Sequence, residues 1–447
     1  MKTSKFLSLL VGLAVVLPLT IRADQDRDRK DRDDRDCEDQ DHFEHNAKTP
    51  VRLIGAITVP GNPIVSADIA WVDPGTERYY LADRSNFGVD IIDAEESDPL
   101  SFSYVGRVTG MVGPMGSGGG TALTNGGGPN GVLVTPNRHL WAGDGNSTVQ
   151  VADVDPSSAG YLTIVKSIST AISACDAGPG PGGHYCGRAD EMGYDSKDHL
   201  ILVANNAPLS KGAGHAPIDP YATFISADSP YGVVGGPLSF PNAGGLEQPL
   251  WDAGIGRFLL TVPGKLGISK PMIAVINPST RMVERSIAID CASPSIGTVS
   301  ASITGIALAP FQHVLVAACG FPIILNAVSG KVYNVIKQVG GGDEVWYNPG
   351  DGRFYVTGPL NGVAGADQQL GVIDAEKSKW LQNIPDIRGK NPAAFSENNR
   401  IFTVATITAG MALTPSTDTS VCATTFGIKG RGCIAVFTHA GEKDDDK

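Results

Sequence analysis

The same short pattern recurs along this chain: a polar residue, an apolar strand, a turn and a second apolar strand. The stretch "GPNGVLVTPNRHLWAGDGNSTVQVADVD", residues 128–155, shows it most clearly and adds a third strand that ends in Asp. The other copies begin at Ala67, Ala189, Leu246, Ile303, Gly342 and Asn391. A unit of this size cannot bury its own apolar face, so the copies must pack against one another. This repeat constrains the fold more than any other feature.

Each copy predicts three strands, and a fourth strand precedes the next copy. These fourth strands are "SYVGRV", "LTIVKSI", "GVVGGPLSF", "RSIAI", "VYNVIKQV" and "WLQNIPDI". No fourth strand follows the last copy, whereas "VRLIGAITV", residues 51–59, precedes the first one. The pattern predicts an all-β fold, a seven-bladed β-propeller over residues 49–440 closed by this N-terminal strand. Closure removes the open strand edge that the last blade would otherwise present.

The two ends of the chain differ from the repeats. Residues 1–23 have the charges, the apolar run and the terminal small residue of a signal peptide, which predicts a secreted or periplasmic protein. A retained membrane anchor is the alternative. Residues 24–48 and 441–447 are highly charged, so we expect disordered tails. A tail that binds cations or a surface is the sharper alternative for the N-terminal segment.

Net charge and cysteine content limit the partners and the compartment of this protein. The net charge of −12 argues against a nucleic-acid partner, and no later segment is long and apolar enough for a membrane span. We expect a monomer. Seven cysteines fit an oxidising compartment, although spacing alone does not fix their connectivity. Proximity in sequence suggests the pairs Cys175–Cys186, Cys291–Cys319 and Cys422–Cys433, with Cys37 left over.

One aligned position of the repeat is polar in every copy. It reads Asp68, Asn130, Asp190, Glu247, Thr304, Asp343 and Asn391. The first strand of each blade lines the axis, so these side chains should form a ring at one mouth of the central channel. The second strand returns to that mouth, where it ends in Asp83, Asp144 or Asn205. Glu191, Gln248 and Glu344 follow the ring by one residue and should point into the blade layer.

A ring with several carboxylates repels itself unless a cation lies in it. Hard oxygen ligands suit a divalent ion, calcium above all. The ring therefore predicts a metal site built from Asp68, Asn130, Asp190 and Glu247. Two alternatives stay open: the polar ring binds only water and inter-blade backbone, or it binds an organic ligand.

Two groups of propellers resemble parts of this chain. "DIIDAE", "AVINPSTRMVERSI" and "GVIDAEKSKW" resemble the repeats of bacterial YVTN-type seven-bladed propellers. "GPNGVLVTPNRHLWAGDGN" and "LEQPLWDAGIGRFLL" resemble the SMP-30/gluconolactonase group. In that group a Glu, two Asn and an Asp hold a divalent ion, which implies Glu247, Asn130 and Asp190 here, with Asp68 or Asn205 standing in for the second Asn. That group usually has six blades, so this chain departs from it.

Two functions of different classes follow. The first is a metal-assisted hydrolase of the lactonase or esterase kind, in which the ion polarises a carbonyl and activates water. Asp190 or Glu191 would be the general base, and His184, a side chain that titrates near neutral pH, would assist. The second is a non-catalytic propeller that binds a small ligand or a protein. No GxSxG or HExxH motif is present, which favours the second function, whereas the number of carboxylates favours the first.

Overall fold

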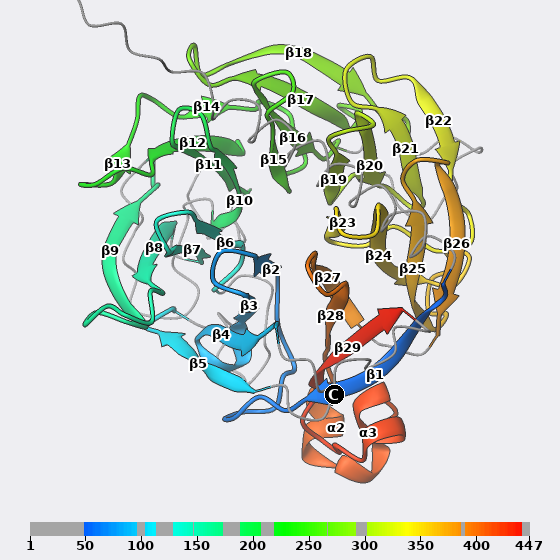
Figure 1. Ribbon diagram of the computed structural model, residues 1–447. Helices are drawn as coiled ribbons and strands as arrows, with labels where there is room; N and C mark the ends of the chain where they lie inside the picture. The colour runs from blue at the N-terminus through cyan, green and yellow to red at the C-terminus, as the bar shows by residue number, and fades with distance from the viewer. Residues whose placement is uncertain are drawn as a thin grey trace, which may run out of the picture. The chain divides into compact units, whose positions relative to one another are not determined.

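The strands form seven antiparallel sheets arranged around one axis, so the predicted seven-bladed propeller is confirmed (Figure 1). The computed structural model describes residues 49–95, 103–112, 128–145, 147–172, 188–206, 219–265, 267–291, 302–385 and 389–439. The expected signal peptide, both charged tails, Cys37, the Cys175–Cys186 pair and His184 lie outside these residues.

The first four blades follow the chain from inner to outer strand. Blade one contains β2 (Ala70–Asp73), β3 (Arg78–Asp83), β4 (Gly88–Asp93) and β5 (Tyr104–Thr109), with the 3-10 turn η1 (Arg84–Asn86) after β3. Blade two contains β6 (Val132–Thr135), β7 (His139–Asp144), β8 (Thr148–Asp153) and β9 (Thr163–Ser169). Blade three contains β10 (Ala189–Asp195), β11 (Leu200–Asn205), β12 (Tyr221–Ser226), β13 (Gly232–Val233) and β14 (Leu238–Ser239). Blade four contains β15 (Pro249–Asp252), β16 (Arg257–Val262), β17 (Met272–Asn277) and β18 (Met282–Ala288).

The last three blades complete the ring. Blade five contains β19 (Ile306–Ala309), β20 (Val314–Ala318), β21 (Pro322–Asn326) and β22 (Val332–Val335). Blade six contains β23 (Val345–Asn348), β24 (Arg353–Pro359), β25 (Gln368–Asp374) and β26 (Lys379–Ile384). Blade seven contains β27 (Gly389–Phe395), β28 (Arg400–Ala405), β29 (Cys433–His439) and β1 (Val51–Ile57).

The N-terminal strand closes the ring as the repeat count predicts. β1 pairs antiparallel with β29, from Val51 opposite His439 to Ile57 opposite Ile434. Beyond the ladder, the Gln382 side chain of blade six accepts from the Val51 amide at 2.9 Å and donates to its carbonyl at 2.7 Å. The first and last described segments are therefore tied to each other and to the neighbouring blade.

The apolar core is divided into clusters, each of which joins two neighbouring blades. Alternation along each strand explains this, because successive side chains point to opposite faces of a sheet. In β3, for example, Tyr79 and Leu81 pack toward blade seven, whereas Tyr80 and Ala82 pack toward blade two. Stacking therefore buries both faces of every blade, and the ring must be complete for each blade to be covered.

Blade three departs from the predicted strand over residues 232–240. The outer strand is split into β13 and β14, which pair with opposite ends of β12. The sequence between them is Val-Gly-Gly-Pro, and Gly235 has a positive φ of 75°. A proline without an amide hydrogen and a left-handed glycine interrupt the ladder there.

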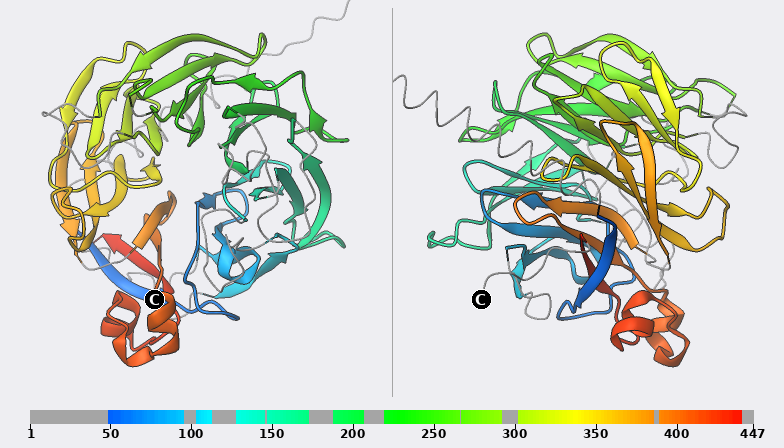
Figure 2. Two further views of the ribbon diagram at one scale, coloured as in Figure 1. Left: turned by 180° about the vertical axis from the view of Figure 1, so that it is seen from behind. Right: turned by 45° about the vertical axis from the view of Figure 1, so that its right-hand side comes forward.

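A small helical insertion was not expected from the repeat pattern. It connects β28 to β29 and contains α2 (Ala409–Leu413), the 3-10 turn η2 (Pro415–Thr417) and α3 (Val421–Phe426). It lies outside the ring, as both views in Figure 2 show. The helices are too short to give a periodicity signal in the sequence.

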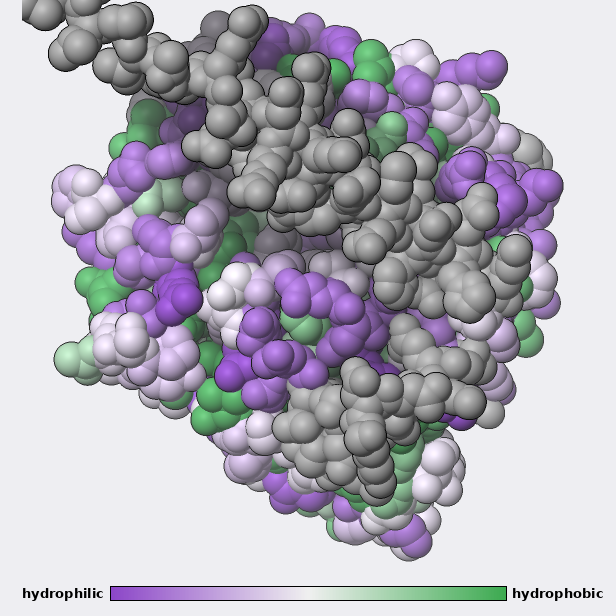
Figure 3. Space-filling model, in the orientation of Figure 1, coloured by the Kyte–Doolittle hydropathy of each residue, from purple (hydrophilic) through white to green (hydrophobic). Residues whose placement is uncertain are grey.

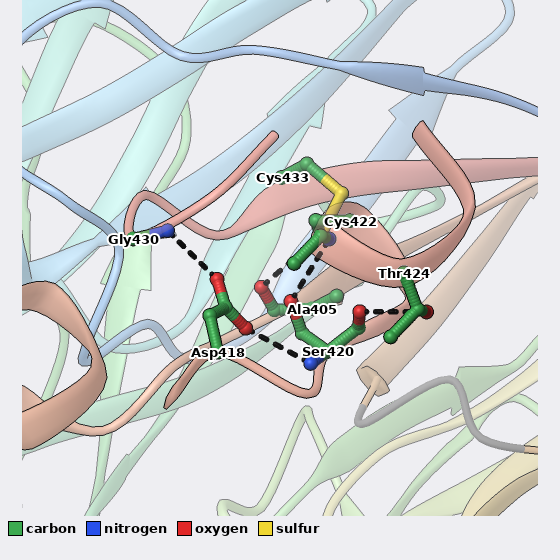
Figure 4. The surroundings of a disulfide bond; sticks show 8 residues. Ala405, Asp418, Ser420, Cys422, Thr424, Gly430 and Cys433 are labelled. Atoms are coloured by element: carbon green, nitrogen blue, oxygen red, sulfur yellow. Dashed lines mark hydrogen bonds between the residues drawn. A yellow bond between two sulfur atoms is a disulfide. The ribbon is translucent and has the colours of Figure 1, made fainter. Parts of the chain in front are cut away.

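The predicted Cys422–Cys433 disulfide anchors this insertion (Figure 4). Next to it, the buried Asp418 carboxylate accepts from the Ser420 amide at 2.9 Å and from the Gly430 amide at 2.8 Å. The Ser420 side chain in turn caps the start of α3. The bond thus fixes the start of α3 to the first residue of β29.

The predicted Cys291–Cys319 disulfide is also present, and it joins blades four and five.

On the face in Figure 3, hydrophobic residues form small separate patches among hydrophilic ones. None of the described helices could span a membrane.

Candidate functional site at the channel mouth

The seven polar positions lie at one end of the inner strands, as the alignment predicts. Asp68, Asn130, Glu247, Thr304 and Asp343 each stand two residues before an inner strand, and Asp190 and Asn391 lie within β10 and β27 near a register shift. The inner strands of the blades are grouped around the axis in Figure 1. These positions therefore come together at one mouth of the channel.

Arg84 of η1 joins the first two members of the ring. Its Nη2 donates to the Asp68 carboxylate, and its Nε and Nη2 donate to the Asn130 Oδ1 atom at 3.1 and 2.6 Å. All three residues are buried, and the Asn130 amide nitrogen donates onward to the Ala189 carbonyl at 2.9 Å. A guanidinium group thus lies where the sequence predicts a metal ion between Asp68 and Asn130.

A second arginine acts in the same way on blade three. Arg188 donates to the Asp190 Oδ2 atom through Nε at 2.8 Å and Nη2 at 2.5 Å. The Asn206 amide nitrogen also donates to this atom at 3.2 Å, and it lies 3.5 Å from the Glu247 Oε1 atom. Burial disfavours the charge of Arg188, yet the carboxylates of Asp190, Asp68 and Glu247 outweigh burial and raise the pKa of Arg188.

The residues that end the second strands hydrogen-bond to nearby loops. The backbone places Asp83 beside Asp68 and Asp144 beside Asn130, as predicted, but the carboxylates turn to their own loops. Asp83 accepts from the Asn86 side chain at 2.6 Å, and Asp144 accepts from the Gly145 amide at 2.9 Å. The Asn205 amide donates to Thr170 at 2.7 Å. These hydrogen bonds hold the loops that surround the ring.

Glu191, Gln248 and Glu344 were expected to point into the blade layer, and two of them bind the inner strands of other blades. Gln248 accepts from the Ile306 amide of the next blade at 2.7 Å. Glu344 accepts from the Ala70 amide at 3.2 Å, although blade seven stands between their two blades. The inner strands have no further strand toward the axis, so their amides remain available to side chains from other blades. The alternation of side chains along a strand does not predict such bonds between blades.

Glu191 is the least satisfied of the buried carboxyls at this mouth. It is 4% exposed, and its Oε2 atom has no hydrogen-bond partner among the described residues. Burial, followed by the charges of Glu247, Asp190, Asp343 and Glu344, raises its pKa well above the usual range. The carboxyl group therefore lies among the ring carboxylates and not in the apolar layer.

Burial raises the pKa of other carboxyl groups at the mouth as well. For Glu247 the charges of Asp190 and Asp343 add to burial, so its pKa lies well above the usual range. For Glu344 the Ala70 amide partly offsets burial, and the pKa still lies well above that range. Burial raises the pKa of Asp190, and the charge of Arg188 offsets this rise only in part. Two arginines, together with these upward pKa shifts, thus reduce the negative charge that the sequence predicts a metal ion to neutralise.

Below the ring, two indoles narrow the channel. Trp71 of β2 and Trp346 of β23 pack edge to face, with ring centroids 5.3 Å apart at an interplanar angle of 81°. Their blades, one and six, are separated by blade seven, so the contact joins two blades that are not neighbours. Trp71 lies three residues after Asp68, and Trp346 lies three residues after Asp343. The polar mouth therefore has an aromatic floor.

In this arrangement, three of the four residues predicted to hold a divalent ion are bound by arginine side chains. Asp68 and Asn130 share Arg84, and Asp190 is bound by Arg188. No group of three His, Cys, Asp or Glu side chains within the described ranges is placed to hold a metal ion. The predicted general bases, Asp190 and Glu191, are adjacent and both buried.

Arg84 and Asn206 are site residues that sequence reasoning missed. Both directly follow the second-strand end positions Asp83 and Asn205, and both reach from their own ring residue toward the ring residue of the next blade. The aligned "DR" and "NN" pairs at these ends were a signal that could have found them.

Comparison with known proteins supports the fold alone. No protein-family model matches the chain, and no curated protein matches it. A chain in the crystal structure of the mitotic checkpoint complex is similar, with a TM-score of 0.52 and 12% sequence identity over 91% of this chain and 96% of that one. The chain is thus a seven-bladed β-propeller, and the YVTN and SMP-30 resemblances remain predictions.

Proposed function

We propose that this protein is an exported propeller that binds a small, positively charged ligand at the acidic mouth of its channel. Six carboxyl groups and two arginines gather there, so the cluster keeps an excess of acidic groups. The carboxyl groups belong to Asp68, Asp190, Glu191, Glu247, Asp343 and Glu344. The observation that carries the proposal is the buried Glu191 carboxyl, whose Oε2 atom has no partner among the described residues.

Physical chemistry supports a ligand there. A buried polar atom without a hydrogen bond costs about 1–3 kcal/mol. A cation that enters the mouth would supply that bond and relieve the mutual repulsion of the carboxylates. The two disulfides among the described residues fit an extracellular compartment, as the N-terminal sequence predicts.

The direct test is thermal unfolding of wild type and Glu247→Gln with calcium, with a chelator and with organic cations. A bound ligand raises the melting temperature by mass action. We expect at least one cation to stabilise the wild type, and the Glu247→Gln variant to lose most of that stabilisation. If no cation moves the melting temperature of the wild type, the proposal is wrong and the mouth is a solvated polar ring.

A metal-assisted or metal-free hydrolase is the second candidate, favoured by the contrast between Asp190 and Glu191. Arg188 holds Asp190 in a charged environment, whereas burial and neighbouring carboxylates favour the protonated form of Glu191. Two carboxyls whose environments push their pKa values apart are suited to base and acid roles. His184 keeps its predicted assisting role, and calcium its predicted role as the ion.

A screen of lactones and carboxylic esters tests the second candidate. We expect hydrolysis of at least one compound to fall about a hundredfold or more in Glu191→Gln and Asp190→Asn. Rates equal to those of buffer alone for every compound would leave the binding function as the sole candidate.

A further inference from the structure

The geometry points to a primary amine, and not a bare metal ion, as the ligand that this mouth accepts; this inference rests on the proposed function. We propose that the ammonium group of the ligand donates to Glu191 and Glu247, and that a polar group at its other end meets Asn391.

The first argument concerns the positions that a metal ion would need. A calcium ion requires six to eight oxygen atoms. The oxygens of Asp68 and Asn130 accept from Arg84, and one oxygen of Asp190 accepts from Arg188 and Asn206. A divalent ion there would lie against two guanidinium groups, which repel it.

The second argument concerns two buried polar residues of the mouth, Glu191 and Asn391, that have atoms without partners. The Glu191 Oε2 atom has no hydrogen-bond partner among the described residues. In Asn391, both the Oδ1 and Nδ2 atoms also lack one among these residues. Both residues are buried, at 4% and 0% exposure. A metal ion could satisfy the oxygen atoms only. An organic ligand with a donor and an acceptor could satisfy the Asn391 nitrogen as well.

The third argument concerns where these groups lie on the ring. Glu191 belongs to blade three, beside Glu247 of blade four, and Asn391 belongs to blade seven. In a ring of seven blades, blade seven is opposite the junction between blades three and four. The unsatisfied groups thus lie on opposite sides of the axis, and one molecule across the mouth would reach both.

The fourth argument selects the kind of ammonium group. The Glu191 oxygen needs a hydrogen-bond donor, and charge-assisted bonds are the strongest of these. A primary ammonium group has three N–H donors, whereas a quaternary ammonium group has none. The site therefore discriminates between two cations of equal charge.

Isothermal titration calorimetry of the full-length mature protein tests the inference with five probes. They are 4-amino-1-butanol, n-butylamine, tetramethylammonium, 1,4-butanediol and calcium chloride. We expect 4-amino-1-butanol to bind most tightly, n-butylamine more weakly, and the other three not at all. Tetramethylammonium controls for charge, and the diol controls for the hydroxyl group.

Variants assign the two ends of the ligand. Glu191→Gln should weaken both amines by about tenfold or more, because a charged hydrogen-bond partner is lost. Asn391→Ala should weaken 4-amino-1-butanol by about fivefold and leave n-butylamine unchanged. Glu284→Gln, which alters an exposed pair with Arg257 on blade four, is the control and should change neither.

The outcomes separate this inference from the proposed function. Binding of calcium without binding of amines overturns the inference and keeps the cation-binding function. Equal binding of tetramethylammonium and n-butylamine also overturns it, because charge alone would then suffice. No binding by any probe overturns both.

Discussion

The closing seam and the channel mouth both bury ionisable side chains, but they satisfy them very differently. At the seam, the Asp351 carboxylate accepts from Tyr355 at 2.5 Å and lies 2.8 Å from the His439 Nε2 atom. The other ring nitrogen of His439 lies 3.2 Å from Arg353 and 3.2 Å from Thr49. At the mouth, in contrast, carboxyl groups face one another across the axis.

The difference separates the ionisable groups of the seam, which stabilise the fold, from those of the mouth, which we propose bind a ligand. Donors and acceptors alternate at the seam, so burial strengthens each bond. At the mouth, burial and like charges raise the pKa of Glu191, Glu247 and Glu344. Such an arrangement costs stability, which is characteristic of functional sites.

The largest effect should come from removing the closing strand. Deletion of residues 49–57 exposes the edge of β29 and removes the buried Val51 and Ile57 side chains. We expect loss of the cooperative unfolding transition and aggregation in size-exclusion chromatography. A deletion variant with the wild-type melting temperature would show that the seam is not needed.

Breaking the seam at a single residue should have the next largest effect. His439→Leu leaves the fully buried Asp351 carboxylate without its imidazole partner, which should cost about 3 kcal/mol in chemical denaturation. His199→Leu is the matched control, because the His199–Asp228 pair makes a similar contact at 3.0 Å but is exposed. Equal losses in the two variants would contradict the account of the seam.

The disulfide at the start of β29 should contribute somewhat less. Cys422 and Cys433 are 11 residues apart, and the chain-entropy model assigns such a loop about 2–3 kcal/mol. The Cys422→Ser/Cys433→Ser variant should therefore unfold at lower denaturant concentration. Peptide mapping under non-reducing conditions that finds both thiols free would refute the bond.

The smallest effect should come from the mouth, and its sign should be opposite. The folded-state pKa of Glu191 and Glu247 is raised above the unfolded value, which is about 4.3 for Glu. Their contribution to stability is fully present below that value and is lost as pH rises through the folded-state pKa. Glu191→Gln should thus raise the melting temperature at pH 8 by about 2 °C and flatten its pH dependence. A lower melting temperature of the variant at pH 8 would indicate a structural role for this carboxylate.

The sequence predicted the parts of this molecule that depend on a repeated pattern. Seven aligned copies fixed the blade count, the closing strand at residues 51–59 and the ring position from Asp68 to Asn391. These features repeat because each blade must cover its neighbours, so one alignment contains them all. The Cys291–Cys319 and Cys422–Cys433 bonds were predicted from proximity in sequence and are present.

The partners of the ring residues could not be predicted in the same way. Arg84 and Asn206 follow the aligned second-strand ends of their blades, so the alignment can locate them, but it does not report which ring residues they bind. The bond from Glu344 to the Ala70 amide joins blades six and one, past blade seven, so no spacing along the chain reports it. The helical insertion likewise occurs in a single blade. Unique side chains decide the charge balance of the mouth, whereas the repeat decides only where that mouth lies.

Proton release on ligand binding tests the central claim most directly, namely that the crowded carboxyl groups of the mouth form a cation site. The 4-amino-1-butanol probe, or calcium if only calcium binds, is added to weakly buffered wild-type protein at pH 7. A cation stabilises the ionised form of Glu191 and Glu247, so we predict release of protons at saturation and tighter binding at higher pH. Glu191→Gln should release fewer protons. Saturable binding without proton release, or with the same release in Glu191→Gln and wild type, would contradict the claim.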